Sequence, residues 1–323
     1  MELNHKRILV TGGTGFIGSA VVNKLLSLDC NVNIISMPED PTWKLEDLSN
    51  CKFFNVDLRN LDEAEKSIKE IQPEIIFHLA GIIDTGLSKE VINKVFSFNL
   101  EVTKNLLIAL NPYNYELFIN TGSGNEYGNI EPPFIETDRE NPISPYSAAK
   151  IAQTYFCKMV SNVYDKPIIT VRPFLIYGPK QISRSLIPSL IYSGIEKKSL
   201  SLTPCEQIRD FIFIEDVVDA FISLAQNFNR VKNLGIFNVG SGKGTKILKT
   251  VNIIEKIIKN TNFLVGKKPY RPGETMLHYA SIEKIKNAIN WSPKWSIEKG
   301  IKATIEWWQK NREIWIKYKN IWE

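Results

Sequence analysis

The chain has 323 residues, a formal net charge of +5 and an ordinary hydrophobic share of 43%, which suits one large domain or two smaller ones. The positive charge lies in short, scattered runs and no apolar run approaches the ~18 residues of a membrane span, so we expect neither nucleic acid nor a membrane as a partner. Four widely separated cysteines form no CxxC pair, which argues against a disulfide framework or a metal site and predicts a cytoplasmic protein.

Short apolar runs alternate with amphipathic stretches over the first half of the chain. This pattern predicts strands at 7–11, 32–36, 52–56, 75–80, 116–121 and 168–172. It predicts helices at 16–28, 61–71, 90–110 and 145–164. Strands that alternate with helices of this length are typical of a parallel, doubly wound sheet.

The pattern loosens after Pro173. We expect one more strand at 236–239, a helix at 246–259 and a last amphipathic helix at 297–309. The predicted fold class is therefore α/β, with a doubly wound parallel sheet and a smaller, mixed C-terminal part. We place the N-terminal domain at 1–172, joined by later segments at about 210–245, and the C-terminal part mainly at 173–323.

A glycine-rich loop joins the first predicted strand to the first predicted helix. Its early glycines allow a tight turn and let backbone amides approach a pyrophosphate, and its last glycine allows close packing of the helix on the sheet. The loop fits two dinucleotide-binding spacings, and its place between a strand and a helix supports that function over a structural turn. The residues predicted to bind the cofactor here are Gly12, Gly15, Phe16, Ile17 and Gly18.

The end of the second predicted strand carries Ser36, where an acid that binds the ribose 2′-hydroxyl is expected. A serine does not repel a 2′-phosphate, so this position favours NADP over NAD. NAD stays open as the alternative, because Glu39 or Asp40 could curl back toward the ribose. Asp57 and Leu58 follow the third strand and are candidates for the adenine contact, although Asp57 could equally cap the next helix.

Tyr146 and Lys150 are four residues apart on the helix predicted at 145–164, so they share one face. An ammonium near a phenol lowers the pKa of the phenol, which can then exchange a proton with a sugar hydroxyl or ketone. Ser123 follows a strand end, where ligands bind in parallel sheets, and its hydroxyl could bind the same substrate oxygen. These three residues are the predicted catalytic set.

Together with further ordered motifs, these residues resemble the extended short-chain dehydrogenase/reductase family, which includes nucleotide-sugar epimerases, dehydratases and ketoreductases. The resemblance covers nearly the whole chain. Its other segments are residues 76–81, 99, 105–107, 172–179, 209–217, 238–240, 271–274 and 291–293.

The resemblance implies a Rossmann-like, dinucleotide-binding domain at 1–172 and a mainly substrate-binding part at 173–323. It also implies roles for several further residues. Leu79, Ala80, Gly81 and Asn99 would bind the cofactor, together with Tyr146 and Lys150. Arg209 and Arg271 would hold the diphosphate of a nucleotide-sugar substrate, for which guanidinium groups are suited. Asn125, Leu175 and Glu274 would lie near the substrate. The family also implies a homodimer formed through the helices predicted at 90–110 and 145–164.

Departures from the family pattern narrow the predicted chemistry. Gly124 and Asn125 stand where sugar 4,6-dehydratases carry an acid, and Leu175 stands where many 4-epimerases carry an asparagine. With Ser36 at the strand end, these residues favour an NDP-4-keto-6-deoxyhexose 4-reductase. An NDP-sugar 4-epimerase is the alternative, and a dehydratase or a non-catalytic nucleotide sensor is less favoured.

Overall fold

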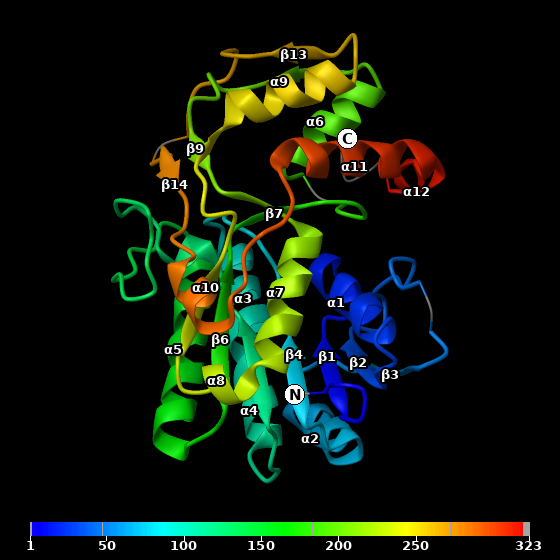
Figure 1. The fold of residues 1–323 in the computed structure, drawn as a ribbon, viewed down its shortest axis with the longest axis vertical. Coiled ribbons are helices and arrows are strands. Elements are labelled where there is room, and N and C mark those ends of the chain that lie inside the picture. Colours follow the sequence, from blue (N-terminus) through cyan, green and yellow to red (C-terminus); the bar gives the residue numbers. More distant parts are fainter. Residues whose placement is uncertain (1, 47, 183, 272, 319–323) are drawn as a thin grey trace.

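The computed structural model describes residues 2–46, 48–182, 184–271 and 273–318. Its central sheet has seven strands (Figure 1). They are β1 (Ile8–Thr11), β2 (Val32–Ser36), β3 (Cys51–Asn55), β4 (Ile75–His78), β5 (Leu117–Thr121), β6 (Ile168–Pro173) and β11 (Ile236–Val239). Their order is β11-β6-β5-β4-β1-β2-β3, and all neighbouring pairs are parallel. The sheet confirms the predicted Rossmann-like class, and the seven predicted strands are present.

The strand order reverses at β1, which pairs with β2 on one side and with β4 on the other. Thr11 lies opposite His78 in the β1–β4 register, so these two strands end side by side. Ligands of open parallel sheets bind at the carboxyl ends of the strands where the order reverses. The segments that leave β1 and β4 are the glycine loop and residues 79–81.

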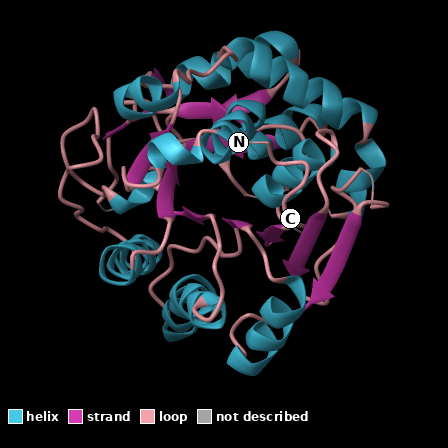
Figure 2. Ribbon diagram, turned by 60° about the horizontal axis from the view of Figure 1, so that its bottom comes forward, coloured by secondary structure: helices cyan, strands magenta, loops and turns pink. Residues whose placement is uncertain are grey.

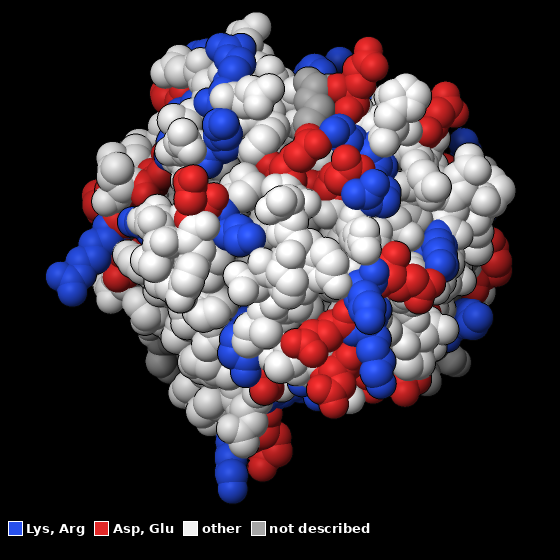
Figure 3. All heavy atoms as spheres, turned by 90° about the horizontal axis from the view of Figure 1, so that it is seen from below, with Lys and Arg blue, Asp and Glu red and all other residues white. Residues whose placement is uncertain are grey.

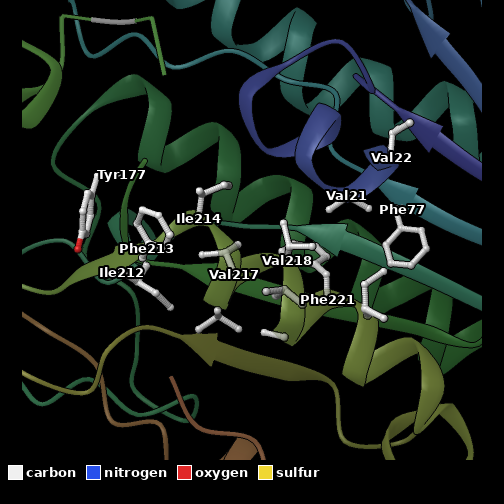
Figure 4. Close-up of a cluster of buried hydrophobic side chains, with 14 of the residues drawn as sticks. Val21, Val22, Phe77, Tyr177, Ile212, Phe213, Ile214, Val217, Val218 and Phe221 are labelled. Atoms are coloured by element: carbon white, nitrogen blue, oxygen red, sulfur yellow. The ribbon is translucent and has the colours of Figure 1, made fainter. Parts of the chain in front are cut away.

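Helices cover both faces of the sheet. On one face, α1 (Phe16–Leu26) packs against α7 (Ile214–Gln226); on the other lie α2 (Leu61–Ile71), α4 (Val102–Leu110) and α5 (Pro145–Tyr164). Figure 4 shows the core of the first face, where side chains of α7 lie beside Val21 of α1 and Phe77 of β4. The sequence did not predict α7, although nine of its residues are buried.

The single helix predicted at 90–110 is wrong in detail. The structure has α3 (Lys89–Phe96), a π-helical turn at Ser97–Glu101 and then α4. The side-chain amide of Asn99 explains the turn, because its Nδ2 donates to the carbonyl of Val95 at 2.8 Å. In a regular α-helix this carbonyl would accept the backbone N–H of Asn99. Turns of this kind occur often at functional sites, and Asn99 is a predicted cofactor residue.

Most of the short strands and helices of the C-terminal part lie beyond the carboxyl ends of the sheet, whereas the helices Phe228–Val231 and Glu283–Ile289 lie beside the sheet (Figures 1 and 2). The strands of the C-terminal part are β7 (Leu175–Tyr177), β8 (Ser199–Ser201), β9 (Ile208–Arg209), β10 (Phe211–Phe213), β12 (Thr245–Lys246), β13 (Asn262–Leu264) and β14 (Leu277–His278). Its helices are α6 (Leu186–Ile195), α8 (Phe228–Val231), α9 (Ile247–Ile257), α10 (Glu283–Ile289), α11 (Ile297–Lys310) and α12 (Arg312–Lys317). Of these, only α9 and α11 were predicted. The division at residue 172 stays a prediction.

Two surface properties bear on partners. In the view of Figure 3, acidic and basic side chains lie intermixed rather than in a field of one sign. Within the described residues, the helices are too short or too polar to cross a bilayer.

Candidate active site

The glycine loop between β1 and α1 is crowded in a way that only glycine allows. Gly12 has a φ of +67°, and a Cβ atom there would lie 2.8 Å from the Cα of Ala80. A Cβ on Gly18 would overlap the carbonyl oxygen of Gly12. Gly15 precedes α1, and no side chain caps the first amides of that helix. The loop therefore fits a pyrophosphate, which these free amides and the helix N-terminus would bind.

The residues at the end of β2 form a small polar group. Thr14 Oγ1 lies 3.1 Å from Ser36 Oγ and 3.3 Å from Asp40 Oδ2. Asp40 is exposed, and it comes from the loop four residues beyond the strand end. Lys44 is nearby, with its Nζ donating to the carbonyl of Thr14 at 3.3 Å. A carboxylate thus reaches the place where the strand itself supplies only Ser36.

The two adenine candidates after β3 have different surroundings. Asp57 forms an ion pair with Arg59 at 2.5 Å, which holds the pKa of the Asp57 carboxyl below its usual value. The side chain of Leu58 is buried in the core against α2 and α4. Its carbonyl accepts a hydrogen bond from Asn105 Nδ2 at 3.0 Å, so this segment is firmly held.

The segment after β4 meets the π-helical turn and α5. A Cβ on Gly81 would lie 2.6 Å from Asn99 Oδ1 and 3.4 Å from Lys150 Nζ, so these three predicted residues lie together. Asn99 Oδ1 is buried, and no hydrogen-bond partner reaches it among the described residues. Buried polar atoms rarely stay unpaired, so a ligand donor fits here.

Tyr146 and Lys150 lie in the first two turns of α5, where Pro145 follows the N-cap residue Ser144. Both side chains are almost fully buried. Lys150 Nζ donates to the carbonyl of Thr121 and to Gln153 Oε1, each at 2.9 Å. Burial lowers the pKa of Lys150 to about 8 and raises the pKa of Tyr146 to about 12.

Ser123 lies at the end of β5 and caps a short 3₁₀ turn, Gly124–Glu126. Its Oγ accepts the amide hydrogen of Asn125 at 3.1 Å, while its own amide donates to Glu126 Oε1 at 2.7 Å. A hydrogen bond with the hydroxyl of Ser123 lowers the pKa of the Tyr146 phenol and so partly opposes the rise caused by burial. The predicted set of Ser123, Tyr146 and Lys150 therefore forms one group around the end of β5.

Two residues that the sequence did not single out enclose Gly124. A Cβ there would lie 3.1 Å from the ring of Phe174, and His278 Nε2 lies 3.1 Å from the carbonyl of Gly124. Burial lowers the pKa of His278 to about 4, so the ring is neutral at pH 7. Asn125, the next residue, is exposed. His278 lies on a two-residue strand that shows no periodic signal.

The predicted diphosphate residues are not equivalent. Arg209 on β9 pairs with Glu274 at 2.7 Å, and both side chains are mostly buried. Arg271 is exposed, and its carbonyl accepts the amide hydrogen of Glu274 at 3.0 Å. Leu175 on β7 is 39% exposed. The structure thus joins Arg209 and Glu274, whereas the side chain of Arg271 is exposed.

The arrangement has close counterparts among known proteins. Residues 8–240 match the NAD dependent epimerase/dehydratase family. A putative UDP-glucose 4-epimerase of Methanocaldococcus jannaschii is 30% identical over 94% of this chain and 99% of its own length. A dTDP-D-glucose 4,6-dehydratase of Bos taurus is 28% identical over 96% of this chain and 90% of its own.

A solved structure gives the same picture. The UDP-glucuronic acid 4-epimerase of Bacillus cereus, in complex with UDP-glucuronic acid and NAD, superposes with a TM-score of 0.85 at 27% identity, covering 94% of this chain and 99% of its own. These matches confirm the resemblance to the extended short-chain dehydrogenases/reductases. The chain is an enzyme of that type, and it belongs to the NAD dependent epimerase/dehydratase family.

Proposed function

We propose that the chain is an NDP-sugar 4-epimerase that works with NAD. From the sequence alone, this activity was the alternative to a 4-reductase. The observation that carries this choice is the position of Asp40 beside Thr14 and Ser36. A carboxylate at this place accepts a hydrogen bond from the ribose 2′-hydroxyl and repels a 2′-phosphate. An epimerase must retain its cofactor through a full cycle, and such a contact favours retention of NAD.

The relatives support the same choice. Two of the three proteins compared above are named as 4-epimerases of UDP-sugars, and the solved one contains NAD. The third is named as a dehydratase, but Gly124 argues against that activity here. This residue lacks the carboxyl group that removal of water needs, and a Cβ here would lie 3.1 Å from the Phe174 ring, so the ring would have to shift by a few tenths of an ångström to admit a side chain.

The proposed chemistry assigns one task to each of three side chains. Bound NAD would supply the acceptor and later the donor of a hydride at C4 of the sugar. Tyr146 takes the proton from the O4 hydroxyl. It returns the proton after the 4-keto sugar has rotated in the site and presents its opposite face to the cofactor. The ammonium of Lys150 favours the phenolate form of Tyr146. Ser123 donates its hydroxyl hydrogen to O4 and so orients the reacting group.

The same residues set the position of the substrate. Arg209, fixed by Glu274, would bind the diphosphate, and Arg271 would join it from the surface. Asn99 Oδ1 and the amides of the glycine loop would hold the cofactor.

The activity test separates the two readings. The purified protein is incubated without added cofactor with UDP-glucose, UDP-glucuronate or UDP-N-acetylglucosamine, and the products are identified by NMR. We expect the C4 epimer of one of them. Oxidation of NADPH by an NDP-4-keto-6-deoxyhexose, with no epimer from any UDP-sugar, would establish the reductase instead.

We also propose that the protein forms a homodimer through α5. Tyr155, Met159 and Val163 lie at successive four-residue steps on this helix and are 49%, 39% and 66% exposed, so they form one apolar face. Light scattering should give twice the mass of the chain, and Val163→Glu should give the monomer. A monomer in the unsubstituted protein would refute the proposal.

A further inference from the structure

A group of buried charges lies next to Ser123, and no role was predicted for its members from the sequence. Glu126 and Arg172 are completely buried, and Glu140 approaches from the segment before α5. Arg172 Nε donates to Glu126 Oε2 at 2.9 Å, and Nη2 of the same guanidinium lies 2.8 Å from that oxygen. The same Nη2 lies 2.5 Å from Glu140 Oε1. One guanidinium therefore serves two carboxylates.

The charges of this group do not balance on their own. Arg172 carries one positive charge against the two negative charges of Glu126 and Glu140, which leaves one negative charge inside the protein. Lys150 is a buried cation whose two acceptors, Thr121 O and Gln153 Oε1, are both neutral. With Lys150 included, the net charge of the group is zero, as burial of charges requires.

Glu126 also lies against the backbone that Lys150 binds. Its Oε1 accepts the amide hydrogen of Ser123 at 2.7 Å, and a Cβ on Gly122 would overlap the same oxygen. Lys150 donates to the carbonyl of Thr121, the residue before Gly122. The carboxylate of Glu126 and the ammonium of Lys150 thus bind backbone groups two residues apart, the amide of Ser123 and the carbonyl of Thr121.

The hydrogen bonds indicate that Glu126 is ionised. Burial raises the pKa of its carboxyl, while Arg172 opposes that rise. Oε1 accepts the amide hydrogen of Ser123, and Oε2 accepts from Nε of Arg172, while the hydroxyl of Thr154 also favours the carboxylate form. Protonation would place a donor against one of these donors, so the geometry suits the carboxylate.

We propose that Glu126 is a positioning residue, whose carboxylate fixes the Ser123 segment and supplies the negative charge that keeps Lys150 protonated in the buried site. The consequence for the reaction rests on the proposed function, because it concerns the Tyr146–Lys150 pair. The charge balance itself is a property of the folded chain and is measured without any sugar.

The remaining titratable groups around the pair do not supply this charge. Burial lowers the pKa of His78 to about 3 and raises the pKa values of the phenols and the thiol nearby, so all are neutral at pH 7 in the chain without cofactor and substrate. They are His78 on β4, Tyr127 beside Glu126, and Tyr146 and Cys157 on α5.

The direct test follows the protonation of Lys150 by NMR. The protein is labelled with ¹³C at the ε carbon of lysine, and the signal of Lys150 is identified by its loss in Lys150→Met. Glu126→Gln keeps an acceptor for the Ser123 amide but removes the charge. We expect the titration midpoint of Lys150 to fall by about one pH unit or more, the scale of a close opposite charge. An unchanged midpoint would overturn the proposal.

A matched control is Glu136→Gln. Glu136 Oε1 also accepts a backbone amide hydrogen, that of Asn238 at 2.9 Å, but within the part of the chain that the structure describes Arg172 forms its ion pairs with Glu126 and Glu140. This variant should leave the midpoint of Lys150 in place. A fall equal to that of Glu126→Gln would show a general loss of packing and would also count against the proposal.

If Glu126→Gln does not fold, Glu140→Gln replaces it. The side chain of Glu140 is only 8% exposed, and its charge acts through Arg172 at a greater distance, so a smaller downward shift of the Lys150 midpoint is expected. No shift in this folded variant would overturn the proposal.

The pH profile of turnover joins the charge to the reaction. In Glu126→Gln, the alkaline limb of kcat should move to lower pH together with the Lys150 midpoint, because the ammonium is lost earlier. A lower kcat with an unmoved limb would show a structural role only and would overturn the proposal. A shifted midpoint in a protein that converts no sugar nucleotide would uphold the charge balance and reject the proposed function.

Discussion

The two sides of the site are built from different parts of the chain. On the cofactor side, backbone atoms pack so closely at Gly12 and Gly18 that no side chain fits. On the substrate side, the contacts are made by side chains that reach distant segments, such as Arg209 with Glu274 and His278 with the carbonyl of Gly124. A binding loop made of closely packed backbone atoms suits one class of ligand. On the substrate side, substitution of a few side chains can change which substrate binds and leave the fold intact.

The largest effect is expected where the two sides meet. Tyr146→Phe removes the proton acceptor and leaves both binding sides unchanged. Turnover should fall by at least ~100-fold, the usual scale for loss of a general acid or base. The cofactor and substrate affinities should stay near those of the unsubstituted protein. Turnover close to the original value would remove Tyr146 from the proposed mechanism.

The second-largest effect is expected from a methyl group added to the glycine loop. In Gly18→Ala, the added Cβ would overlap the carbonyl of Gly12, and overpacking of this kind costs about 1–3 kcal/mol. We expect the NAD dissociation constant to rise roughly 10- to 100-fold, with little change in the affinity for the sugar nucleotide. Calorimetric titration with each ligand measures both affinities. An equal loss of affinity for NAD and for the sugar nucleotide would contradict the assignment of Gly18 to the cofactor side.

The substrate side should respond in the opposite way. Arg209→Ala removes a cation that Glu274 already orients, so the KM for the sugar nucleotide should rise about 10-fold, the effect of one charged hydrogen bond. Arg271→Ala should have a smaller effect, because this exposed side chain must be ordered on binding. A larger effect at Arg271, or a change confined to the cofactor constant, would show that the two roles are misplaced.

The smallest effect is expected at the edge of the cofactor side. Asp40→Asn should weaken NAD by about 3- to 10-fold, since one partly exposed hydrogen bond is lost, and it should improve binding of NADP. Glu39→Gln changes the same charge at the preceding exposed residue and should leave both affinities unaltered. If the two variants behave alike, Asp40 does not select the cofactor.

The same contrast between the two sides explains what the sequence could predict. Apart from α7 and the π-helical turn at Ser97–Glu101, the elements of the cofactor side were predicted from their hydrophobic period, and the motifs around Gly12, Ser123 and Tyr146 lie at the ends of such elements. In the substrate part, strands such as β9 and β14 have two residues and show no period. Their places depend on partners such as Arg209 with Glu274, which are 65 residues apart.

The acid at the ribose position shows a second limit. The sequence predicts a strand-end residue from its register, and the register is correct at Ser36. Asp40 reaches the same place through the loop beyond the strand, and loop conformation is set by contacts that spacing does not reveal. The preference for NADP followed from Ser36 alone, and the loop is the reason we propose NAD.

The central claim is that C4 is oxidised and reduced again within one site. The most direct measurement runs the reaction in D₂O, with the sugar nucleotide that the protein converts and no added cofactor. NMR then follows the hydrogen at C4 of the epimerised product. Our account predicts that C4 keeps its original hydrogen, because the hydride leaves and returns without meeting solvent. Deuterium at C4, or no epimer from any sugar nucleotide tested, would contradict it.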